Sequence, residues 1–348
     1  MEDNRKKVLL IVNPCAGKNK SRTGTFDIVD KFSDDEYEFT VRTTTCQGDA
    51  TNIVKRELPG KDLVICCGGD GTLNETINGV MDMPKRVPIG YVPTGTTCDL
   101  ASTLGIPSDA KKATDIILSG NTNDYDIGLF NNRYFSYVAS FGAFTKCSYA
   151  TPQKLKNRFG HAAYVFTALG EIKDVHGIQM RIEHDGGVLE GKFSFGAISN
   201  STSVAGMFKL IEEDVRLNDG IFEVLLVPDM KIHNIIPTIR KAQKQDYDGK
   251  HVIYLRTTKL KITSPYEEVE WTLDGEYGGK HSEVMVHILE RAIRICTEDS
   301  NLFIKHEDPV IEAPVAAEAP KEKKRLIKRK KSDEAPSENN EEAAETEE

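Results

Sequence analysis

The chain has 348 residues, a formal net charge of -9, and hydrophobic residues at 39% of its positions. This length predicts about two domains, which is enough chain to bury a sizeable core. The acidic balance argues against a general nucleic-acid binder, for which a broadly basic face would be expected.

The cysteines and the N-terminus favour a cytoplasmic protein. The seven cysteines are odd in number and scattered, without a CxxC pair, which indicates reduced thiols. The first residues contain too few apolar side chains for the core of a signal peptide. No apolar run approaches the roughly 18 residues of a membrane span, so we expect any membrane contact to be peripheral.

Short apolar runs alternate with helical patterns over residues 1–123. The predicted strands are Lys7–Val12, Tyr37–Thr43, Asp62–Cys67 and Val87–Val92. Helices are expected at Gly24–Phe32, before Pro59, and after residue 70, where Leu73, Ile77 and Val80 recur at helical spacing. This alternation predicts a doubly wound, Rossmann-like α/β domain with a parallel sheet.

Four loops rich in small and polar residues follow these strands. They are Asn13–Lys18, Thr43–Thr45, Gly68–Thr72 and Pro93–Asp99. Ligands of such sheets bind at the carboxyl ends of the strands, where all four loops would meet. The convergence predicts one ligand site at this edge.

The strongest of these loops lies within Leu63–Val80, where a buried strand, two glycines and a helix N-terminus follow one another. Backbone N–H groups and the helix dipole at such a corner hold phosphate. Asp70 would repel a phosphate unless a cation lies between them, so we expect a metal-complexed nucleotide. The alternative for this loop is an ordinary strand-to-helix turn. For the loop at Pro93–Asp99, the alternative is that its Thr and Asp side chains simply cap the next helix.

From Asp124 the pattern changes to short alternating or apolar segments between Gly, Asn and Asp turns. These segments predict an antiparallel β-sandwich as a second domain. Helices are expected at 152–175 and 233–245. Asp274 and Glu276 stand in a turn between strand-like segments, which by itself is typical of a plain hairpin.

Residues 305–348 form a charged tail. Lys321–Lys331 is nearly all basic, and Ser332–Glu348 is acidic. This composition predicts a disordered segment. The basic block would suit an anionic lipid surface, and the alternative is a solvated polyampholyte that neutralises itself.

With these motifs assembled, the chain resembles the diacylglycerol kinase catalytic-domain family of lipid kinases, most closely its soluble bacterial members. The resemblance covers residues 7–304 and depends on GGDGT at Gly68–Thr72, PxGTxxD at Pro93–Asp99 and LDGEYGG at Leu273–Gly279, in this order. It implies a nucleotide domain at 1–123 completed by about 291–304, a lipid-substrate β-sandwich at 124–290, and ATP in the cleft between them.

The resemblance also implies site residues. Those expected to bind ATP are Asn13, Pro14, Cys15, Ala16, Gly17, Thr44, Gly68, Gly69, Asp70, Gly71, Thr72, Leu73, Asn74, Glu75 and Thr96. The general base would be Asp274 or Glu276. A structural Mg²⁺ would be held by Asp219 and the carbonyls of Arg216 and Ile221, with Asp70, Asp99 and Asp126 joining metal and water near the cleft.

The implied activity is Mg²⁺-dependent transfer of phosphate from ATP to diacylglycerol or a related lipid, giving phosphatidic acid in phospholipid metabolism. The protein would then associate peripherally with the membrane surface during turnover. The alternatives are a kinase for another lipid such as a sphingoid base, an NAD kinase, or a non-catalytic nucleotide sensor. A sheet edge in the second domain would suit a homodimer.

One segment departs from the family pattern. The family's usual N-D-F-A/G-R is Cys98-Asp99-Leu100-Ala101-Ser102 here, so an amide and an arginine are missing. Arginine is a natural phosphate clamp, and its loss bears on how phosphate or lipid is handled.

Overall fold

The computed structural model describes most of the chain. The described residues are 5–32, 36–96, 98–143, 176–204, 208–210, 213–229, 237–238, 241 and 244–305. The chain divides into a compact unit, Met1–Ile311, and a second unit, Glu312–Glu348, which lies outside the described residues. The predicted helix at 152–175, most of the one at 233–245 and the charged tail after Lys305 also lie outside them.

The labelled helices lie within the first 118 residues. The helices are η1 (Ala16–Asn19), α1 (Lys20–Lys31), α2 (Asp49–Glu57), α3 (Asp70–Met81), α4 (Asp99–Thr103) and α5 (Ala110–Leu118). The first strands are β1 (Lys6–Val12), β2 (Tyr37–Thr43), β3 (Leu63–Gly68) and β4 (Ile89–Pro93). The β2 bounds coincide with the prediction, and the other three strands lie within two residues of theirs at each end.

The first four strands form a parallel sheet in the order β2-β1-β3-β4. Val8 to Val12 are at most 3% exposed, because both faces of the sheet are covered, and this explains the unbroken apolar run. Strand β2 lies on one side of β1, and β3 lies on the other side of β1. The strand order therefore reverses between β1 and β3, which is where doubly wound sheets bind ligands.

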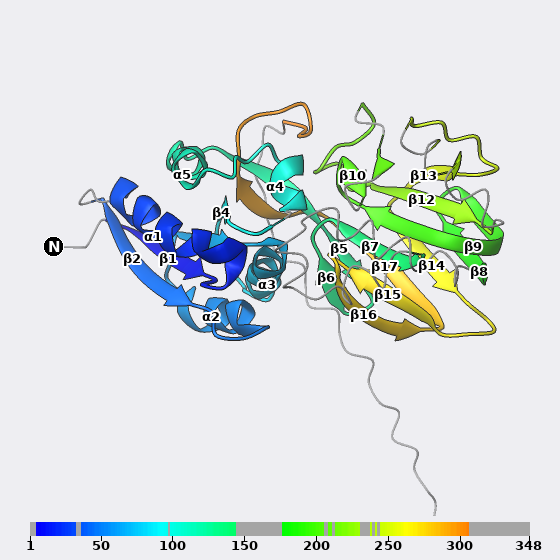
Figure 1. Ribbon diagram of the computed structural model, residues 1–348, viewed down its shortest axis with the longest axis horizontal. Helices are drawn as coiled ribbons and strands as arrows, with labels where there is room; N and C mark the ends of the chain where they lie inside the picture. Colours follow the sequence, from blue (N-terminus) through cyan, green and yellow to red (C-terminus); the bar gives the residue numbers. More distant parts are fainter. Residues whose placement is uncertain are drawn as a thin grey trace, which may run out of the picture. The chain divides into compact units, whose positions relative to one another are not determined.

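The helices cover the parallel sheet in two groups (Figure 1). Helices α1 and α5 contact each other on one face, and α2 and α3 contact each other on the opposite face. This arrangement confirms the predicted doubly wound α/β architecture.

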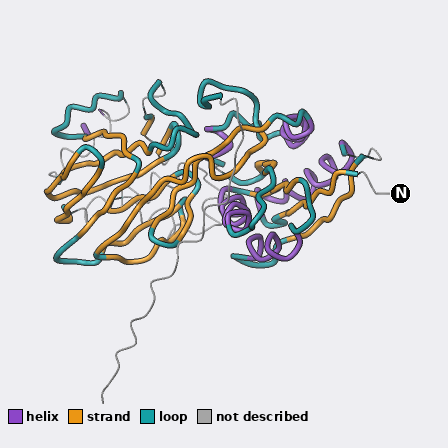
Figure 2. The backbone as a smooth tube through the Cα atoms, turned by 180° about the vertical axis from the view of Figure 1, so that it is seen from behind, coloured by secondary structure: helices purple, strands orange, loops and turns teal. Residues whose placement is uncertain are grey.

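Antiparallel strands make up the rest of the described fold (Figure 2). They are β5 (Thr122–Phe130), β6 (Arg133–Phe135), β7 (Val138–Gly142), β8 (Ile178–His184), β9 (Gly187–Ser199), β10 (Ser203–Val204), β11 (Phe208–Lys209), β12 (Phe222–Pro228), β13 (Ile253–Thr257), β14 (Lys259–Thr263), β15 (Val269–Leu273), β16 (Glu276–His281) and β17 (Glu283–Cys296). Trp271 anchors their core, with the rings of Phe130 and Phe141 each 4.9 Å from its own.

Strand β17 joins the two halves of the fold. Its last part pairs with β4 in parallel at Ile295 and Ile89, and its longer part pairs with β5 and β14 in antiparallel fashion. Because β17 hydrogen-bonds to strands of both halves, the division of the chain at residues 123 and 290 stays a prediction. In the described part of the chain, no helix has the length and apolar character needed to cross a membrane.

Candidate active site

A cavity of about 750 Å³ opens at the carboxyl ends of β1, β3 and β4, beside the hairpin between β15 and β16. Its walls come from segments more than 200 residues apart in the sequence. It is lined by Asn13, Cys15, Ala16, Gly17, Thr44, Thr45, Cys46, Gln47, Gly69, Asp70, Gly71, Thr72, Glu75, Gly95, Thr96, Asp99, Tyr137, Asp274, Gly275, Glu276 and Tyr277.

Asn13 ties the first loop of the cavity to the third. Its backbone N–H donates to the Cys67 carbonyl at 2.9 Å, and its side-chain amide donates to the Thr72 hydroxyl at 2.9 Å. Its side-chain oxygen accepts the Cys15 N–H at 2.9 Å, which fixes the path of the loop. The loop after β1 is therefore held against the N-terminus of α3.

Glycines let two of the loops approach closely. A Cβ on Gly95 would lie 2.6 Å from the Gly69 Cα, a distance that real Cβ atoms do not reach. Gly71, in the first turn of α3, faces Glu276, whose Oε1 would be 3.1 Å from an added Cβ. Helix α3 thus begins at the cavity without a side-chain cap from Gly69, and a helix N-terminus attracts phosphate.

Asp70 and Asp99 place two carboxyl groups at the cavity. The Asp70 carboxylate accepts hydrogen bonds from the backbone of Asp99 at 3.1 Å and of Leu100 at 3.3 Å, so it caps the start of α4. Burial, and next the charge of Asp99, raise the pKa of Asp70 to about 7. Paired carboxyls beside a helix N-terminus could hold a Mg²⁺ ion that accompanies a phosphate group.

Asp274 is buried, and both of its carboxylate oxygens accept hydrogen bonds from neighbouring residues. It accepts hydrogen bonds from Ser136 N and Oγ at 2.6 and 2.7 Å, from Tyr137 N at 2.9 Å and from Val138 N at 3.0 Å. The side-chain amide of Asn74 also donates to it. Burial raises the pKa of Asp274, and the backbone donors oppose this shift. Asp274 thereby joins β6–β7, the β15–β16 hairpin and α3.

Glu276 is half-buried on the wall of the cavity. Its Oε2 accepts one hydrogen bond, from the Gln47 amide at 3.1 Å. Burial is the main reason that the pKa of Glu276 is raised above its usual value. Its backbone begins β16 directly after the tight turn at Asp274 and Gly275, whose φ values are +49° and +80°.

Eleven of the fifteen residues expected to bind ATP line the cavity, and four do not: Pro14, Gly68, Leu73 and Asn74. Leu73 is fully buried in the core, and Asn74 bonds to Asp274 instead. Glu75 reaches the cavity wall, but its carboxylate accepts the N–H groups of Gly48 and Ala50 and so caps α2.

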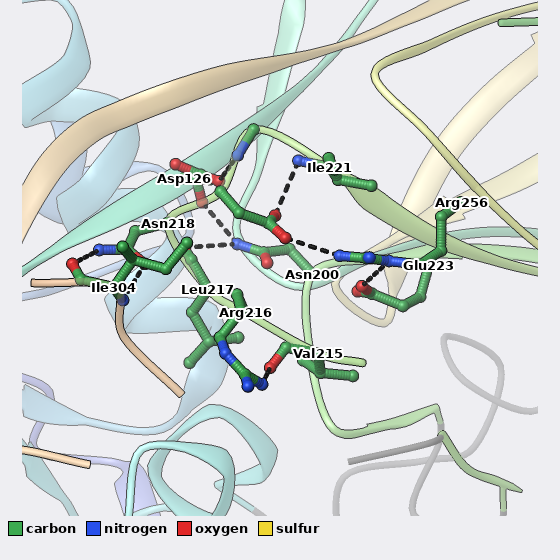
Figure 3. A network of polar contacts seen from close by, with 12 residues as sticks. Asp126, Asn200, Val215, Arg216, Leu217, Asn218, Ile221, Glu223, Arg256 and Ile304 are labelled. Carbon is green, nitrogen blue, oxygen red and sulfur yellow. Dashed lines mark hydrogen bonds and ion pairs between the residues drawn. The ribbon is translucent and has the colours of Figure 1, made fainter. Parts of the chain in front are cut away.

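The expected structural metal residues lie in a second polar network (Figure 3). Asp219 accepts the Ile221 N–H at 3.0 Å and the Arg256 guanidinium at 2.6 Å. Asp126, predicted to lie near the cleft with Asp70 and Asp99, belongs here: it accepts the Gly220 N–H at 2.7 Å and does not line the cavity. Complete burial raises the pKa of Asp126 to about 7.

The residue types of this network fit Mg²⁺. Asp219 supplies a carboxylate beside backbone oxygens of its loop, and hard cations prefer oxygen ligands. Glu223 is completely buried, and its Oε2 has no hydrogen-bond partner among the described residues, although Arg256 donates to its Oε1. One guanidinium therefore faces two carboxyl groups, so the charge of Arg256 does not balance both of them and a bound cation would be favoured. Across the described ranges, no three His, Cys, Asp or Glu side chains form a ready metal cluster.

Sequence reasoning missed several lining residues. Thr45 lies in the predicted loop at 43–45, and extending that loop by two residues would have included Cys46 and Gln47. Tyr137 carries no such signal, because it reaches the cavity only through the contact of the β6–β7 connection with Asp274. Tyr277 and Gly275 lie within LDGEYGG, where the sequence singled out only the acids.

Family models match most of the folded chain. Residues 7–130 match the diacylglycerol kinase catalytic domain, and residues 140–297 match the YegS C-terminal NAD kinase beta sandwich-like domain. The second match agrees with the predicted C-terminal β-sandwich.

Solved structures share this fold. A diacylglycerol kinase from Bacillus anthracis str. Sterne superposes with a TM-score of 0.66 at 22% identity, covering 84% of this chain and 97% of that one. Yeast NADH kinase complexed with NADH superposes with a TM-score of 0.50 at 12% identity, covering 86% and 85%. At these identities the likeness concerns the fold alone.

Curated relatives are more similar in sequence. Diacylglycerol kinase of Bacillus subtilis (strain 168) is 34% identical over 277 residues, covering 79% of this chain and 91% of the relative. Diacylglycerol kinase of Staphylococcus epidermidis (strain ATCC 12228) is 35% identical over 296 residues, covering 84% and 92%. At this identity and coverage, together with the matching catalytic-domain model, the chain belongs to the diacylglycerol kinase family.

Proposed function

We propose that this protein transfers the γ-phosphate of Mg·ATP to the free hydroxyl of diacylglycerol, giving phosphatidic acid. The observation that carries the proposal is a single cavity that combines the N-terminus of α3 with the carboxyl of Glu276. Phosphoryl transfer needs a place for phosphate charge and a group that accepts the hydroxyl proton. The family relationship supplies the class of acceptor.

The phosphates are proposed to lie at the corner between β3 and α3. The first N–H groups of a helix have no partner within the helix, and the dipole adds positive charge at the same point. Asn13 holds the neighbouring loop against Thr72, so the corner keeps its shape before the nucleotide arrives. Bound Mg²⁺ would neutralise phosphate charge there, with Asp70 and Asp99 as the residues that hold it.

Between the two candidate bases, the contacts favour Glu276. A base must reach the substrate hydroxyl with an uncommitted oxygen, and both oxygens of Asp274 already accept two or more hydrogen bonds. Glu276 faces the cavity with one hydrogen bond from Gln47. Its raised pKa makes it a stronger proton acceptor than an exposed glutamate. Asp274 is then the residue that positions the hairpin carrying Glu276.

The acceptor would be met at a membrane surface, because diacylglycerol stays in the lipid phase. The exposed Tyr277 lies beside Glu276 on the cavity wall and offers an amphipathic ring toward an arriving lipid. We therefore propose that the protein is cytoplasmic and associates peripherally with the membrane during turnover.

The test is phosphate transfer from labelled Mg·ATP to diacylglycerol, monoacylglycerol, sphingosine and NAD in mixed micelles. We expect labelled phosphatidic acid as the main product, lost on chelation of Mg²⁺ and lost in the Glu276→Gln variant. Preferred transfer to sphingosine or NAD would replace the proposed acceptor. Binding of ATP without transfer to any acceptor would identify a nucleotide sensor and overturn the proposed activity.

A further inference from the structure

Exposed thiols gather at the cavity. Of the six described cysteines, Cys15 and Cys46 are exposed and the other four are buried. Both exposed cysteines line the cavity that contains Glu276. Cys15 stands among the residues expected to bind ATP, and the proposed phosphoryl transfer gives neither thiol a chemical role.

The four buried thiols lie in an environment that suppresses reactivity. Burial raises the pKa of Cys67 and Cys296 to about 12 and that of Cys98 to about 11, and it raises the pKa of Cys66 further. Since the thiolate is the reactive form, these sulfurs are protected both by inaccessibility and by protonation. Cys15 and Cys46 are accessible to solvent instead.

The strand register brings the two exposed cysteines into neighbouring loops. Strands β1 and β2 are adjacent and parallel, with Val12 paired to Thr43, and the Thr44 N–H still donates to the Val12 carbonyl at 2.9 Å. Neighbouring strands lie about 4.8 Å apart. Cys15 and Cys46 each stand three residues beyond this last pair. Both loops begin after the same pair of the sheet, Val12 and Thr43, and both line the cavity. The two thiols therefore lie at the same cavity.

Each cysteine is coupled to a part of the proposed site. The Cys15 N–H donates to the side chain of Asn13, which holds the first loop against Thr72. Cys46 precedes Gln47, whose amide donates to Glu276 at 3.1 Å. A covalent link between the two sulfurs would therefore draw the two loops together across the space proposed for ATP.

We propose that Cys15 and Cys46 form a modification site at the mouth of the cavity, where a peroxide-class oxidant produces a Cys15–Cys46 disulfide that excludes the nucleotide. The thiolate of one cysteine attacks a peroxide oxygen, so that an S–O bond forms, the O–O bond breaks and water or an alcohol leaves. The second thiol attacks the resulting sulfenic acid, and the S–S bond forms with loss of water. Two thiols are oxidised and one peroxide is reduced.

The exclusion of ATP rests on the proposed nucleotide site, whereas formation of the disulfide does not. The two parts therefore need separate readouts. Binding of a fluorescent ATP analogue to the reduced chain tests the nucleotide site, and peptide mass spectrometry tests the disulfide. If the reduced chain fails to bind the analogue, the proposed function fails, and the identity of the oxidised pair is still decided.

The experiment treats the reduced full-length chain with hydrogen peroxide, with and without Mg·ATP, and identifies linked peptides after digestion without reductant. We expect a Cys15–Cys46 peptide as the main product, at least a tenfold loss of analogue binding, and recovery with dithiothreitol. Saturating Mg·ATP should slow the linkage at least fivefold. The Cys46→Ser variant should lose the linked peptide, and Cys147→Ser should retain it.

Three results would overturn the proposal. The first is linkage mainly through a buried cysteine or Cys147, and the second is oxidation of the two thiols without a bond between them. The third is a Cys15–Cys46 disulfide that leaves binding of the ATP analogue unchanged in a chain that binds it when reduced.

Discussion

Two carboxyl groups of one hairpin have different surroundings, and this difference is the basis of the different tasks proposed for them. Asp274 accepts hydrogen bonds from three consecutive backbone N–H groups, at Ser136, Tyr137 and Val138. Glu276 receives one side-chain hydrogen bond and lines the cavity. The sequence placed both acids in the turn and left the choice open, because spacing carries no information on which donors each oxygen meets.

Replacing these acids by their amides should separate chemistry from stability. Glu276→Gln should lower kcat by about 10²- to 10⁴-fold, the usual contribution of a general base, with little change in Tm. Asp274→Asn should lower Tm as well as kcat, because an amide replaces a buried group with hydrogen bonds worth about 1.5 to 3 kcal/mol each when charged. Thermal melting and steady-state kinetics on both variants check this. An unchanged kcat in Glu276→Gln would remove it from the mechanism.

The activity should depend on the protonation of Glu276. Its folded pKa is raised by burial, so the carboxyl takes up its proton at a higher pH than an exposed glutamate does. We expect kcat/KM to fall as pH decreases through this raised pKa. The apparent pKa of the acid limb of the pH–rate profile should therefore lie above the ordinary glutamate value of about 4.3. A pH–rate profile at saturating Mg²⁺ measures the limb. An acid limb that is unchanged in the residual activity of Glu276→Gln would assign it to another group.

At the level of elements, two loops meet through their glycines. Strand β3 ends at Gly68 and strand β4 at Pro93, and the next turns bring Gly69 and Gly95 into contact. The pattern of strands and glycine turns is local, so the sequence predicted the first four strands to within two residues, whereas α1 begins four residues before the expected Gly24. The contact between the two turns was not, since it depends on the register of β3 with β4.

A methyl group at this contact should damage nucleotide binding. In Gly95→Ala, the new Cβ would lie 2.6 Å from the Gly69 Cα, so backbone must shift at the proposed phosphate corner. We expect the affinity for ATP to fall at least tenfold. Gly191→Ala is the matched control, because its nearest neighbour would be 3.9 Å away in β9. Titration with a fluorescent ATP analogue distinguishes them, and equal affinities would argue against phosphate binding at this corner.

The start of α2 depends on another element. Glu75, on α3, accepts the N–H of Gly48 at 2.7 Å and that of Ala50 at 3.1 Å. Glu75→Ala should lower the free energy of unfolding by about 1 to 3 kcal/mol, because two partly buried N–H donors lose the carboxylate that accepts them. Glu75→Gln retains one acceptor oxygen and should lose less. Urea denaturation of the three proteins orders them, and equal midpoints would show that water replaces the carboxylate.

At the scale of the whole molecule, the folded unit and the C-terminal tail should be separable. Residues 312–348 form a unit of their own, and every residue of the cavity precedes it. Deletion of 312–348 should leave turnover of a short-chain, soluble diacylglycerol within twofold, and should lower at most the binding to anionic vesicles. Kinetic assays and vesicle sedimentation test this. Loss of soluble turnover would show that the tail takes part in catalysis.

Local patterns determined much of this protein from the sequence alone: the parallel α/β half, the antiparallel half, and the loops that carry GGDGT and LDGEYGG. These features follow from periodicity and turn chemistry over a few residues. The tertiary structure decided which loops share the cavity, how many hydrogen bonds each of the two acids accepts, and that Asp126 joins the Asp219 network instead. Those outcomes depend on contacts such as Asn74 to Asp274, 200 residues apart, and no local pattern encodes a pairing at that distance.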